Sequence, residues 1–221
     1  MKPHRAGVPV GARSAGQMRI GRGRRAGLRF DADHGVVTEA LVFLGQLDPE
    51  AIGPSIADAT HYEPTPLADF AALLDAVPVD FASMTFVDLG CGMGRTLLLA
   101  AQRPFRQVLG IEISPALCEI ARDNLAAFDR DLLRCRDVRI VRGDAQSAGL
   151  PRGSLFVYLY NPFHGAVMQR VVERLATHAA GRLVVAYHTP VERALFDDSS
   201  AFELVRELGC GVVYRRLPSA Q

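Results

Sequence analysis

Residues 87–95 read Val-Asp-Leu-Gly-Cys-Gly-Met-Gly-Arg, and this stretch decides the fold. Apolar residues at strand spacing come before it, and residues at helical spacing follow it. A glycine-rich turn between a strand and a helix is typical of α/β domains that bind adenosine-containing ligands. Gly90 permits a tight turn, Gly92 lets a ligand approach the backbone, and Gly94 lets the helix pack closely on the strand.

Further strand and helix patterns alternate along the chain on both sides of this loop. Strands are predicted at 85–89, 107–113, 138–141, 155–160, 183–187, 202–205 and 212–215. Helices are predicted at 67–74, 95–102, 115–128 and 167–175. Such alternation predicts an α/β fold, a three-layer Rossmann-like sheet of about seven mainly parallel strands with helices on both faces. The last two strands, joined through a glycine pair, are expected to form a C-terminal antiparallel hairpin.

Two helix starts carry local signals. Ser114 precedes Pro115, and Thr65 precedes Pro66. Serine and threonine cap helix N-termini with their side-chain oxygen, and proline suits the first helical position. We therefore expect Thr65 and Ser114 to cap the helices that follow them.

Charge divides the chain into two parts. Residues 1–30 hold eight basic residues and no acidic one, whereas the rest holds 17 basic and 24 acidic residues. The basic part is rich in glycine and has no hydrophobic period, which predicts a disordered tail. Residues 31–221 are expected to form one domain, with an N-terminal helical segment at 31–76 and a Rossmann-like core at 77–221.

Several classes of protein are disfavoured by composition. No apolar run reaches the length of a membrane-spanning helix, and the N-terminus lacks the apolar stretch of a signal peptide. The four cysteines form no pair or cluster with metal-ligand spacing, so no metal site is expected. Free thiols indicate a reducing compartment, and we expect a cytoplasmic protein without membrane contact.

Acidic residues follow three successive strands of the predicted sheet. Asp88 precedes the first glycine, Glu112 ends the second strand, and Asp144 follows the third. A carboxylate before the loop repels a pyrophosphate but suits the cationic amino-acid end of S-adenosylmethionine. Glu112 can accept both hydrogen bonds of a ribose diol, and Asp144 can accept from an adenine amino group. The third glycine also comes one residue earlier than in the dinucleotide fingerprint, where Arg95 stands instead. S-adenosylmethionine is therefore the expected cofactor.

These residues resemble those of the seven-stranded class I methyltransferases, from about residue 30 to the end. The chain is more similar to a bacterial subgroup of unassigned substrate that distantly resembles the Dot1-type lysine methyltransferases. Three segments carry the resemblance to this subgroup: residues 30–36, Tyr62-Glu63-Pro64-Thr65-Pro66 and Tyr158-Leu159-Tyr160-Asn161-Pro162-Phe163. The resemblance implies that Tyr62 and Thr65 reach the methionine end of the cofactor. An acid expected before Thr38 is absent, and Thr38 is assigned no role.

The segment Asn161-Pro162-Phe163 follows the fourth predicted strand and is similar to the NPPY and DPPY motifs of amino-directed methyltransferases. The resemblance implies that these residues hold an acceptor nitrogen beside the transferable methyl group. A methyltransferase acting on a nitrogen of a protein side chain or small molecule is thus expected. In the alternative interpretation, Asn161 only caps the next helix and Phe163 packs in the core.

The sequence is compared with three other functions. An RNA or DNA methyltransferase would use the basic tail to hold nucleic acid. A nicotinamide dehydrogenase is disfavoured by Arg95 in the fingerprint position. A non-catalytic S-adenosylmethionine-binding protein would need no acceptor site.

Overall fold

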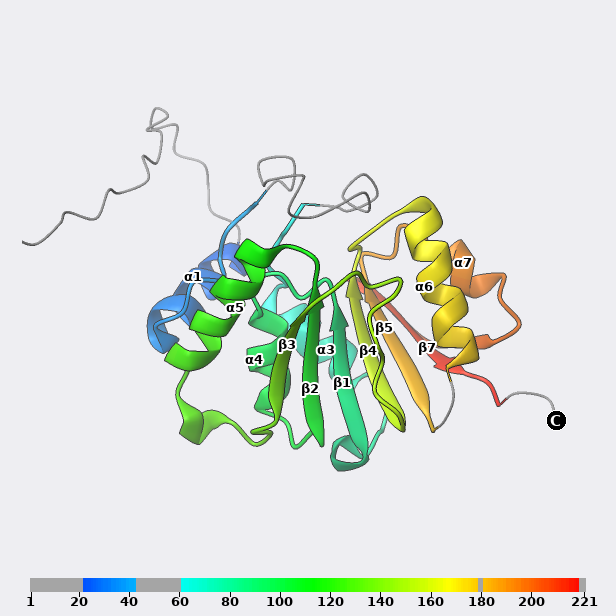
Figure 1. Ribbon diagram of the computed structural model, residues 1–221, viewed down its shortest axis with the longest axis horizontal. Helices are drawn as coiled ribbons and strands as arrows, with labels where there is room; N and C mark the ends of the chain where they lie inside the picture. Colours follow the sequence, from blue (N-terminus) through cyan, green and yellow to red (C-terminus); the bar gives the residue numbers. More distant parts are fainter. Residues whose placement is uncertain (1–21, 43–60, 179–180, 219–221) are drawn as a thin grey trace, which may run out of the picture.

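A computed structural model describes residues 22–42, 61–178 and 181–218. These residues include one seven-stranded sheet with the order β3-β2-β1-β4-β5-β7-β6 (Figure 1). The first five strands are parallel, and β7 is antiparallel to both of its neighbours. The strands are β1 Met84–Leu89, β2 Gln107–Glu112, β3 Val138–Arg142, β4 Ser154–Tyr160, β5 Leu183–His188, β6 Phe202–Leu208 and β7 Gly211–Arg216. The predicted sheet and its C-terminal hairpin are confirmed.

Helices cover both faces of the sheet. Among the described residues they are α1 Arg22–His34, α3 Leu67–Asp75, α4 Arg95–Ala101, α5 Pro115–Ala127, α6 Gly165–Thr177 and α7 Ala194–Asp197, with short 3-10 turns η3 Phe81–Ser83 and η4 Arg130–Leu132. Helices α6 and α7 pack on one face. Helices α3 and α4 pack on the other.

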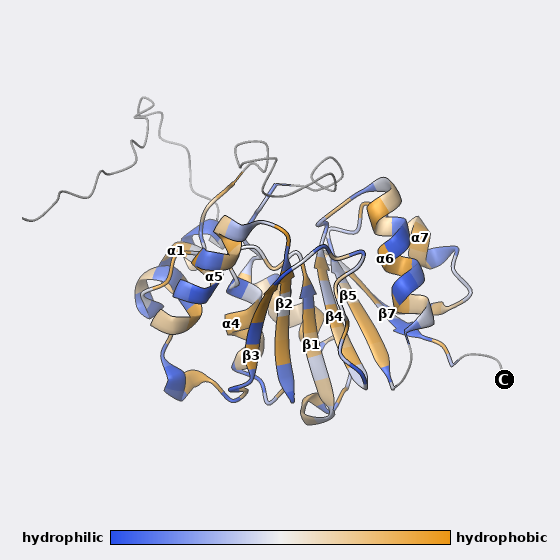
Figure 2. Ribbon diagram, in the orientation of Figure 1, coloured by the Kyte–Doolittle hydropathy of each residue, from blue (hydrophilic) through white to orange (hydrophobic). Residues whose placement is uncertain are grey.

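The core is built from alternating strand residues. In β1, Val87 and Leu89 join the cluster with α6, whereas Phe86 joins the cluster with α3 and α4. Because parallel strands covered on both faces are apolar throughout, the central strands are hydrophobic along most of their length (Figure 2). The acidic residues of β1 and β2, Asp88 and Glu112, lie at or near the carboxyl ends of these strands.

The chain reverses its direction of travel across the sheet at β1, which pairs with β2 on one side and β4 on the other. Neighbouring crossovers leave opposite faces there, so a crevice opens beyond the carboxyl ends of these strands. In open α/β sheets ligands bind in that crevice. The glycine loop after β1 lies at this point.

One predicted helix cap is confirmed and one is wrong. The Ser114 hydroxyl accepts a hydrogen bond from the Leu117 amide at 3.3 Å, and Pro115 opens α5. The helix after Thr65 has Pro66 as its N-cap and makes no side-chain cap hydrogen bond. Thr65 is instead buried, and its side chain bonds to the hydroxyl of Tyr158 at 3.2 Å.

The expected tail differs from the structure over its last nine residues. Helix α1 begins at Arg22, so residues 22–30 are helical, and Gly27 and Phe30 are buried. The Phe30 ring contacts Phe128 at a centroid distance of 6.1 Å. Among residues 23–30, whose burial is described, only these two are buried, which explains why no hydrophobic period is visible there. Residues 1–21 lie outside the described residues.

Candidate functional site

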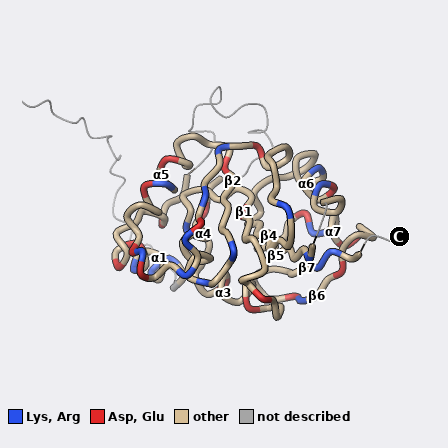
Figure 3. The backbone as a smooth tube through the Cα atoms, turned by 60° about the horizontal axis from the view of Figure 1, so that its bottom comes forward, with Lys and Arg blue, Asp and Glu red and all other residues tan. Residues whose placement is uncertain are grey.

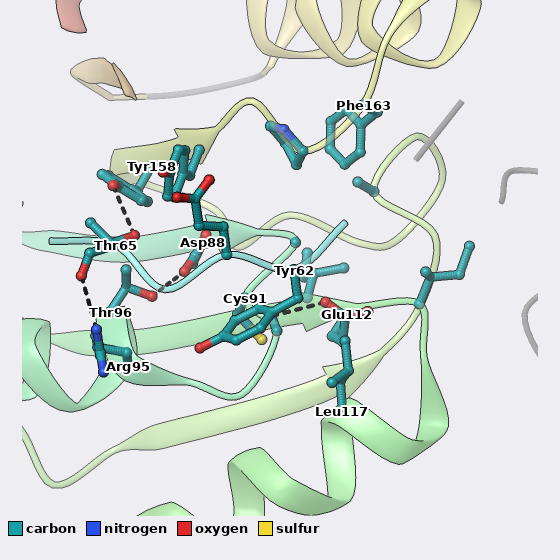
Figure 4. Close-up of a pocket in the computed structure, with 18 of the residues that line it drawn as sticks. Tyr62, Thr65, Asp88, Cys91, Arg95, Thr96, Glu112, Leu117, Tyr158 and Phe163 are labelled. Carbon is teal, nitrogen blue, oxygen red and sulfur yellow. Dashed lines mark hydrogen bonds between the residues drawn. The ribbon is translucent and has the colours of Figure 1, made fainter. Parts of the chain in front are cut away.

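A pocket opens at the carboxyl ends of β1, β2 and β4, where the sheet topology predicts a ligand site (Figure 4). Of the eight residues expected to bind the cofactor, seven line it, namely Tyr62, Thr65, Asp88, Gly90, Gly92, Glu112 and Asp144. Gly94 is not among the lining residues. Residues about 80 positions apart in the chain, Tyr62 and Asp144, thus border one cavity.

The glycine loop depends on left-handed backbone at Gly90 (φ 91°) and Gly92 (φ 52°). A Cβ atom at Gly90 would lie 2.9 Å from Cβ of Pro162, and one at Gly92 would collide with the ring of Tyr62. Side chains are therefore excluded at both positions, and the loop backbone faces the pocket. Gly94 packs against Ala121 of α5, so it serves helix packing rather than the expected helix–strand contact.

Glu112 is buried, and backbone groups hold its carboxylate. Oε2 accepts a hydrogen bond from the Gly92 amide at 2.9 Å, and Oε1 accepts one from the Ser114 amide at 2.8 Å. The amide of Ile113 also hydrogen-bonds this carboxylate, and because a carboxylate can accept about four hydrogen bonds, it can still accept one from a hydroxyl donor. Burial raises the pKa of Glu112, while the hydrogen bonds from the amides of Ser114, Gly92 and Ile113 act in the opposite direction. The carboxylate is thus fixed in one orientation at the end of β2.

Asp88 lies on the floor of the pocket and is 3% exposed. The hydroxyl of Thr96, in the first turn of α4, donates a hydrogen bond to its carboxylate. Burial, with a smaller contribution from the charge of Glu112, raises the pKa of Asp88 to about 7. A cationic ligand beside Asp88 would stabilise its ionised form.

Asp144 follows β3 after Gly143 and lies at the edge of the pocket. Its Oδ1 accepts a hydrogen bond from the Gln146 amide at 2.9 Å, and Oδ2 accepts one from the Gln146 side chain at 2.8 Å. Asp144 is more exposed than Asp88 and Glu112, because β3 is the edge strand of the sheet.

The segment expected to hold the acceptor follows β4. Pro162 and Phe163 line the pocket, and Phe163 is also buried in the core beside α6. Asn161 is not among the lining residues, and it has a left-handed backbone with φ 38°. The N-cap of α6 is His164, so the alternative interpretation of Asn161 as this helix's cap is wrong.

Several residues that also line the pocket had no role predicted from the sequence, and three of them are His61, Glu63 and Tyr160. His61 and Glu63 are exposed, with 3.8 Å between the imidazole Nε2 and the carboxylate Oε2. Burial raises the pKa of Tyr160, and the charge of Glu63 with its hydrogen bond to Tyr160 raises it further. The phenol therefore stays protonated. The position of Glu63 beside Tyr62 in the sequence was the available signal.

The lining fits an adenosyl cofactor with a cationic methionine end. Its acidic members offer acceptors for ammonium, hydroxyl and amino groups, and the loop excludes side chains at two glycines. Within the described residues, no group of three or more His, Cys, Asp and Glu side chains could hold a metal ion. No helix in the described part of the chain is long and apolar enough to span a membrane.

Comparison with protein-family models matches residues 86–183 to a family described as Methyltransferase domain. This segment runs from β1 to the start of β5 and contains the glycine loop, Glu112 and Asp144. A curated relative, trans-aconitate 2-methyltransferase of Methylobacterium radiotolerans, is 42% identical over 67 residues. That match covers 30% of this chain and 25% of the relative, so the chain matches about a quarter of that protein's length.

Solved structures share the architecture. A putative methyltransferase of Escherichia coli superposes with a TM-score of 0.57 at 21% identity, covering 71% of this chain and 89% of that one. The pyocyanin biosynthetic protein PhzM superposes with a TM-score of 0.52 at 19% identity, covering 68% and 55%. At these identities the similarity establishes the fold alone.

Proposed function

We propose that the chain transfers the methyl group of S-adenosylmethionine to a nitrogen, because residues 86–183 match a family described as Methyltransferase domain. The acceptor nitrogen belongs to a protein side chain or a small molecule. When bound, the cofactor supplies an electrophilic methyl group on a sulfonium. The protein then needs to align the acceptor with this carbon, and alignment alone accounts for much of the acceleration.

The charge of the pocket is the observation that carries the choice of acceptor. Four carboxylates line it, from Glu63, Asp88, Glu112 and Asp144. Among the described lining residues Arg95 is the only arginine or lysine, and its guanidinium forms salt bridges to Asp31 and Glu39. An acidic pocket repels anionic acceptors and attracts amines. The name of the curated relative specifies trans-aconitate, a carboxylate, which this lining does not favour.

Cofactor binding is assigned to Tyr62, Thr65, Asp88, Glu112 and Asp144 with the glycine loop. In this proposal Asp88 receives the cationic methionine end, Glu112 the ribose hydroxyls and Asp144 the adenine amino group. The burial of Asp88 and Glu112 and their hydrogen bonds to Thr96, Gly92 and Ser114 support the first two assignments, since both carboxylates can bind donors without reorganising.

Acceptor binding is assigned to Asn161, Pro162 and Phe163. Pro162 lies close to Gly90 of the glycine loop, so the turn after β4 is tied to the cofactor side of the pocket. A left-handed backbone at a residue other than glycine costs energy, and such conformations cluster at functional sites. We assign the Asn161 amide oxygen to the acceptor N–H group.

An amine must be neutral to attack the methyl group, so its proton has to leave. Glu63 is the carboxylate at the mouth of the pocket, and its side chain is 54% exposed. We assign to Glu63 the acceptance of that proton, and to the protonated Tyr160 a hydrogen bond that orients Glu63. Solvent at the mouth then takes the proton away.

Compartment and partners belong to the same proposal. All four cysteines are free thiols, which supports a cytoplasmic location. Basic and acidic positions are interspersed over the described elements, a distribution less suited to a phosphate backbone than a basic face (Figure 3). Nucleic acid contact through the basic tail is retained as an outcome of the experiment below.

The test is transfer of a labelled methyl group from S-adenosylmethionine to a cell lysate by the purified protein. We expect label in the protein or small-molecule fraction, and much less of it with Asn161→Ala. Label confined to RNA or DNA would favour the nucleic-acid methyltransferase. A folded protein that binds S-adenosylhomocysteine but labels no fraction would be the non-catalytic binding protein.

A further inference from the structure

Arg95 is the most completely enclosed charge beside the pocket, with its side chain 2% exposed. Nη1 lies 2.7 Å from Oε2 of Glu39, and Nη2 lies 3.4 Å from Oδ1 of Asp31. Nε donates to the Thr38 hydroxyl at 2.7 Å, and Nη1 also donates to the carbonyl of Thr65 at 3.4 Å. All three guanidinium nitrogens therefore bind segments that precede β1.

Asp31 organises the segment that receives Arg95. Its Oδ2 accepts hydrogen bonds from the amides of Thr38 and Glu39, both at 2.6 Å, and its Oδ1 accepts one from the Thr38 hydroxyl at 2.5 Å. Thr38 is fully buried. The stretch from residue 31, in the last part of α1, to residue 39, which we call the turn 31–39, is thus closed by one carboxylate. The guanidinium is bonded to both ends of this turn.

A second set of contacts leads from this turn to the glycine loop. The Tyr62 hydroxyl donates to the carbonyl of Thr38 at 2.8 Å, and Val42 and Tyr62 exchange backbone hydrogen bonds. The Tyr62 ring lies directly against Gly92, whose amide donates to Glu112 (Figure 4). The ring thereby forms a wall of the pocket next to the carboxylate assigned to the ribose.

We propose that Arg95 is a positioning residue of the cofactor site: by fixing the turn 31–39 it holds Tyr62 against the glycine loop. This inference rests on the proposed function, since it concerns the same pocket. A buried ion pair is seldom the most stabilising choice, because apolar residues of similar volume often replace it without loss. The directional hydrogen bonds of Arg95 can fix the position of the turn 31–39, which apolar packing would not do.

A competing role is direct binding of the cofactor's carboxylate by Arg95. Two carboxylates already surround the guanidinium, so the group of three carries a net negative charge and does not attract another anion. The two roles predict opposite effects of neutralising Glu39. Freeing a cofactor-binding arginine would strengthen cofactor binding, whereas loosening a positioning contact would weaken it.

The test is calorimetric titration of S-adenosylhomocysteine into the full chain and its variants. We expect Arg95→Met to raise Kd by about 10- to 100-fold and Glu39→Gln by about 5-fold, as for lost charge-assisted hydrogen bonds. Tyr62→Phe keeps the ring and loses the bond to Thr38, so it should raise Kd by about 3-fold. In the Arg95→Met/Tyr62→Phe double variant the increase in Kd should be clearly smaller than the product of the two single increases, because both side chains act through Thr38.

The matched control is Arg103→Met, which removes an arginine just after α4 whose salt bridge to Asp75 is on the surface. It should leave Kd unchanged. Hydrogen exchange should show that Arg95→Met exposes the amides of Thr38 and Glu39 while those of β1 and β2 stay protected.

Three outcomes overturn the inference: an Arg95→Met protein with unchanged Kd, multiplicative effects in the double variant, or tighter binding by Glu39→Gln. If Arg95→Met does not fold, Glu39→Gln and Tyr62→Phe decide the matter alone. Failure of the wild-type protein to bind S-adenosylhomocysteine would refute the proposed function itself, which this series distinguishes from a failure of the Arg95 role.

Discussion

The two halves of the pocket differ in how their polar groups are held. In the cofactor half, Asp88 and Glu112 are buried and bonded to Thr96, Gly92 and Ser114. In the acceptor half, the side chains of His61 and Glu63 are 46% and 54% exposed. A preorganised half suits one invariant ligand, and an open half can serve many acceptors. The difference explains why the cofactor follows from this chain more directly than the acceptor.

The largest effect is expected for Asn161, which follows β4 directly before the pocket-lining residue Pro162. Asn161→Ala should lower kcat/KM for methyl transfer by about 100-fold or more, roughly 2.7 kcal/mol, since its amide oxygen orients the acceptor in the transition state. Its Kd for S-adenosylhomocysteine should stay within about 3-fold of wild type. Label transfer to lysate and calorimetry measure the two quantities. An unchanged kcat/KM, or a loss of cofactor affinity as large as the loss of kcat/KM, would show that the two halves of the pocket do not have separate roles.

In the cofactor half, Glu112→Ala should weaken S-adenosylhomocysteine binding by roughly 1–3 kcal/mol. The variant should also melt at a lower temperature, because the amides of Gly92 and Ser114 lose their acceptor. Glu63→Ala is the matched acidic control from the other half, and its Kd should not change. A larger increase in Kd for Glu63→Ala than for Glu112→Ala would contradict the assignment of the cofactor to the half that contains Glu112.

Asp88 allows a test by pH. Its pKa is raised to about 7 from an ordinary 3.8, first by burial, so the folded protein binds this proton more tightly than the unfolded chain. The free energy of unfolding without cofactor should therefore fall as pH rises through this range, by about 2 kcal/mol between pH 5 and 8.

Asp88→Asn removes this contribution, so its melting temperature should decline less over the same pH range. Burial also raises the pKa of Glu112, and that part of the decline remains in both proteins. The variant should bind S-adenosylmethionine more weakly at pH 8, where wild-type Asp88 is ionised. Parallel melting profiles for the two proteins would contradict the buried-carboxylate account.

The smallest effect is expected at the rim of the cofactor half. Asp144→Ala should weaken the binding free energy of S-adenosylhomocysteine by roughly 0.5–1.5 kcal/mol, the value of one hydrogen bond to a partly exposed group. Asp137, which precedes the same strand at its other end and pairs with Arg139, gives the control variant Asp137→Ala. Equal Kd values for the two variants would show that Asp144 does not contact the adenine.

Local signals in the sequence sufficed for the sheet. These signals depend only on residues that are close together in the sequence. They are the strand and helix periods, Ser114 with Pro115, and the glycine turn before Arg95. The same logic failed at Thr65, where a buried bond to Tyr158, 93 positions away, replaced the expected cap. Tertiary contacts of this kind leave no periodic trace.

The N-terminal contribution to the site was missed for the same reason. Asp31 and Glu39 lie 64 and 56 positions before Arg95, and nothing nearby in the sequence marks them as its partners. Thr38 was assigned no role, although it bonds to Asp31, Tyr62 and Arg95. A pocket wall made from a distant segment becomes visible only in three dimensions.

We infer that the crevice beyond β1 and β2 binds S-adenosylmethionine. Calorimetric titration of the full chain with S-adenosylmethionine, S-adenosylhomocysteine and NAD tests it most directly. We expect the first two to bind at one site per chain and NAD to produce no binding heat. Tight binding of NAD without binding of either adenosyl compound would contradict it.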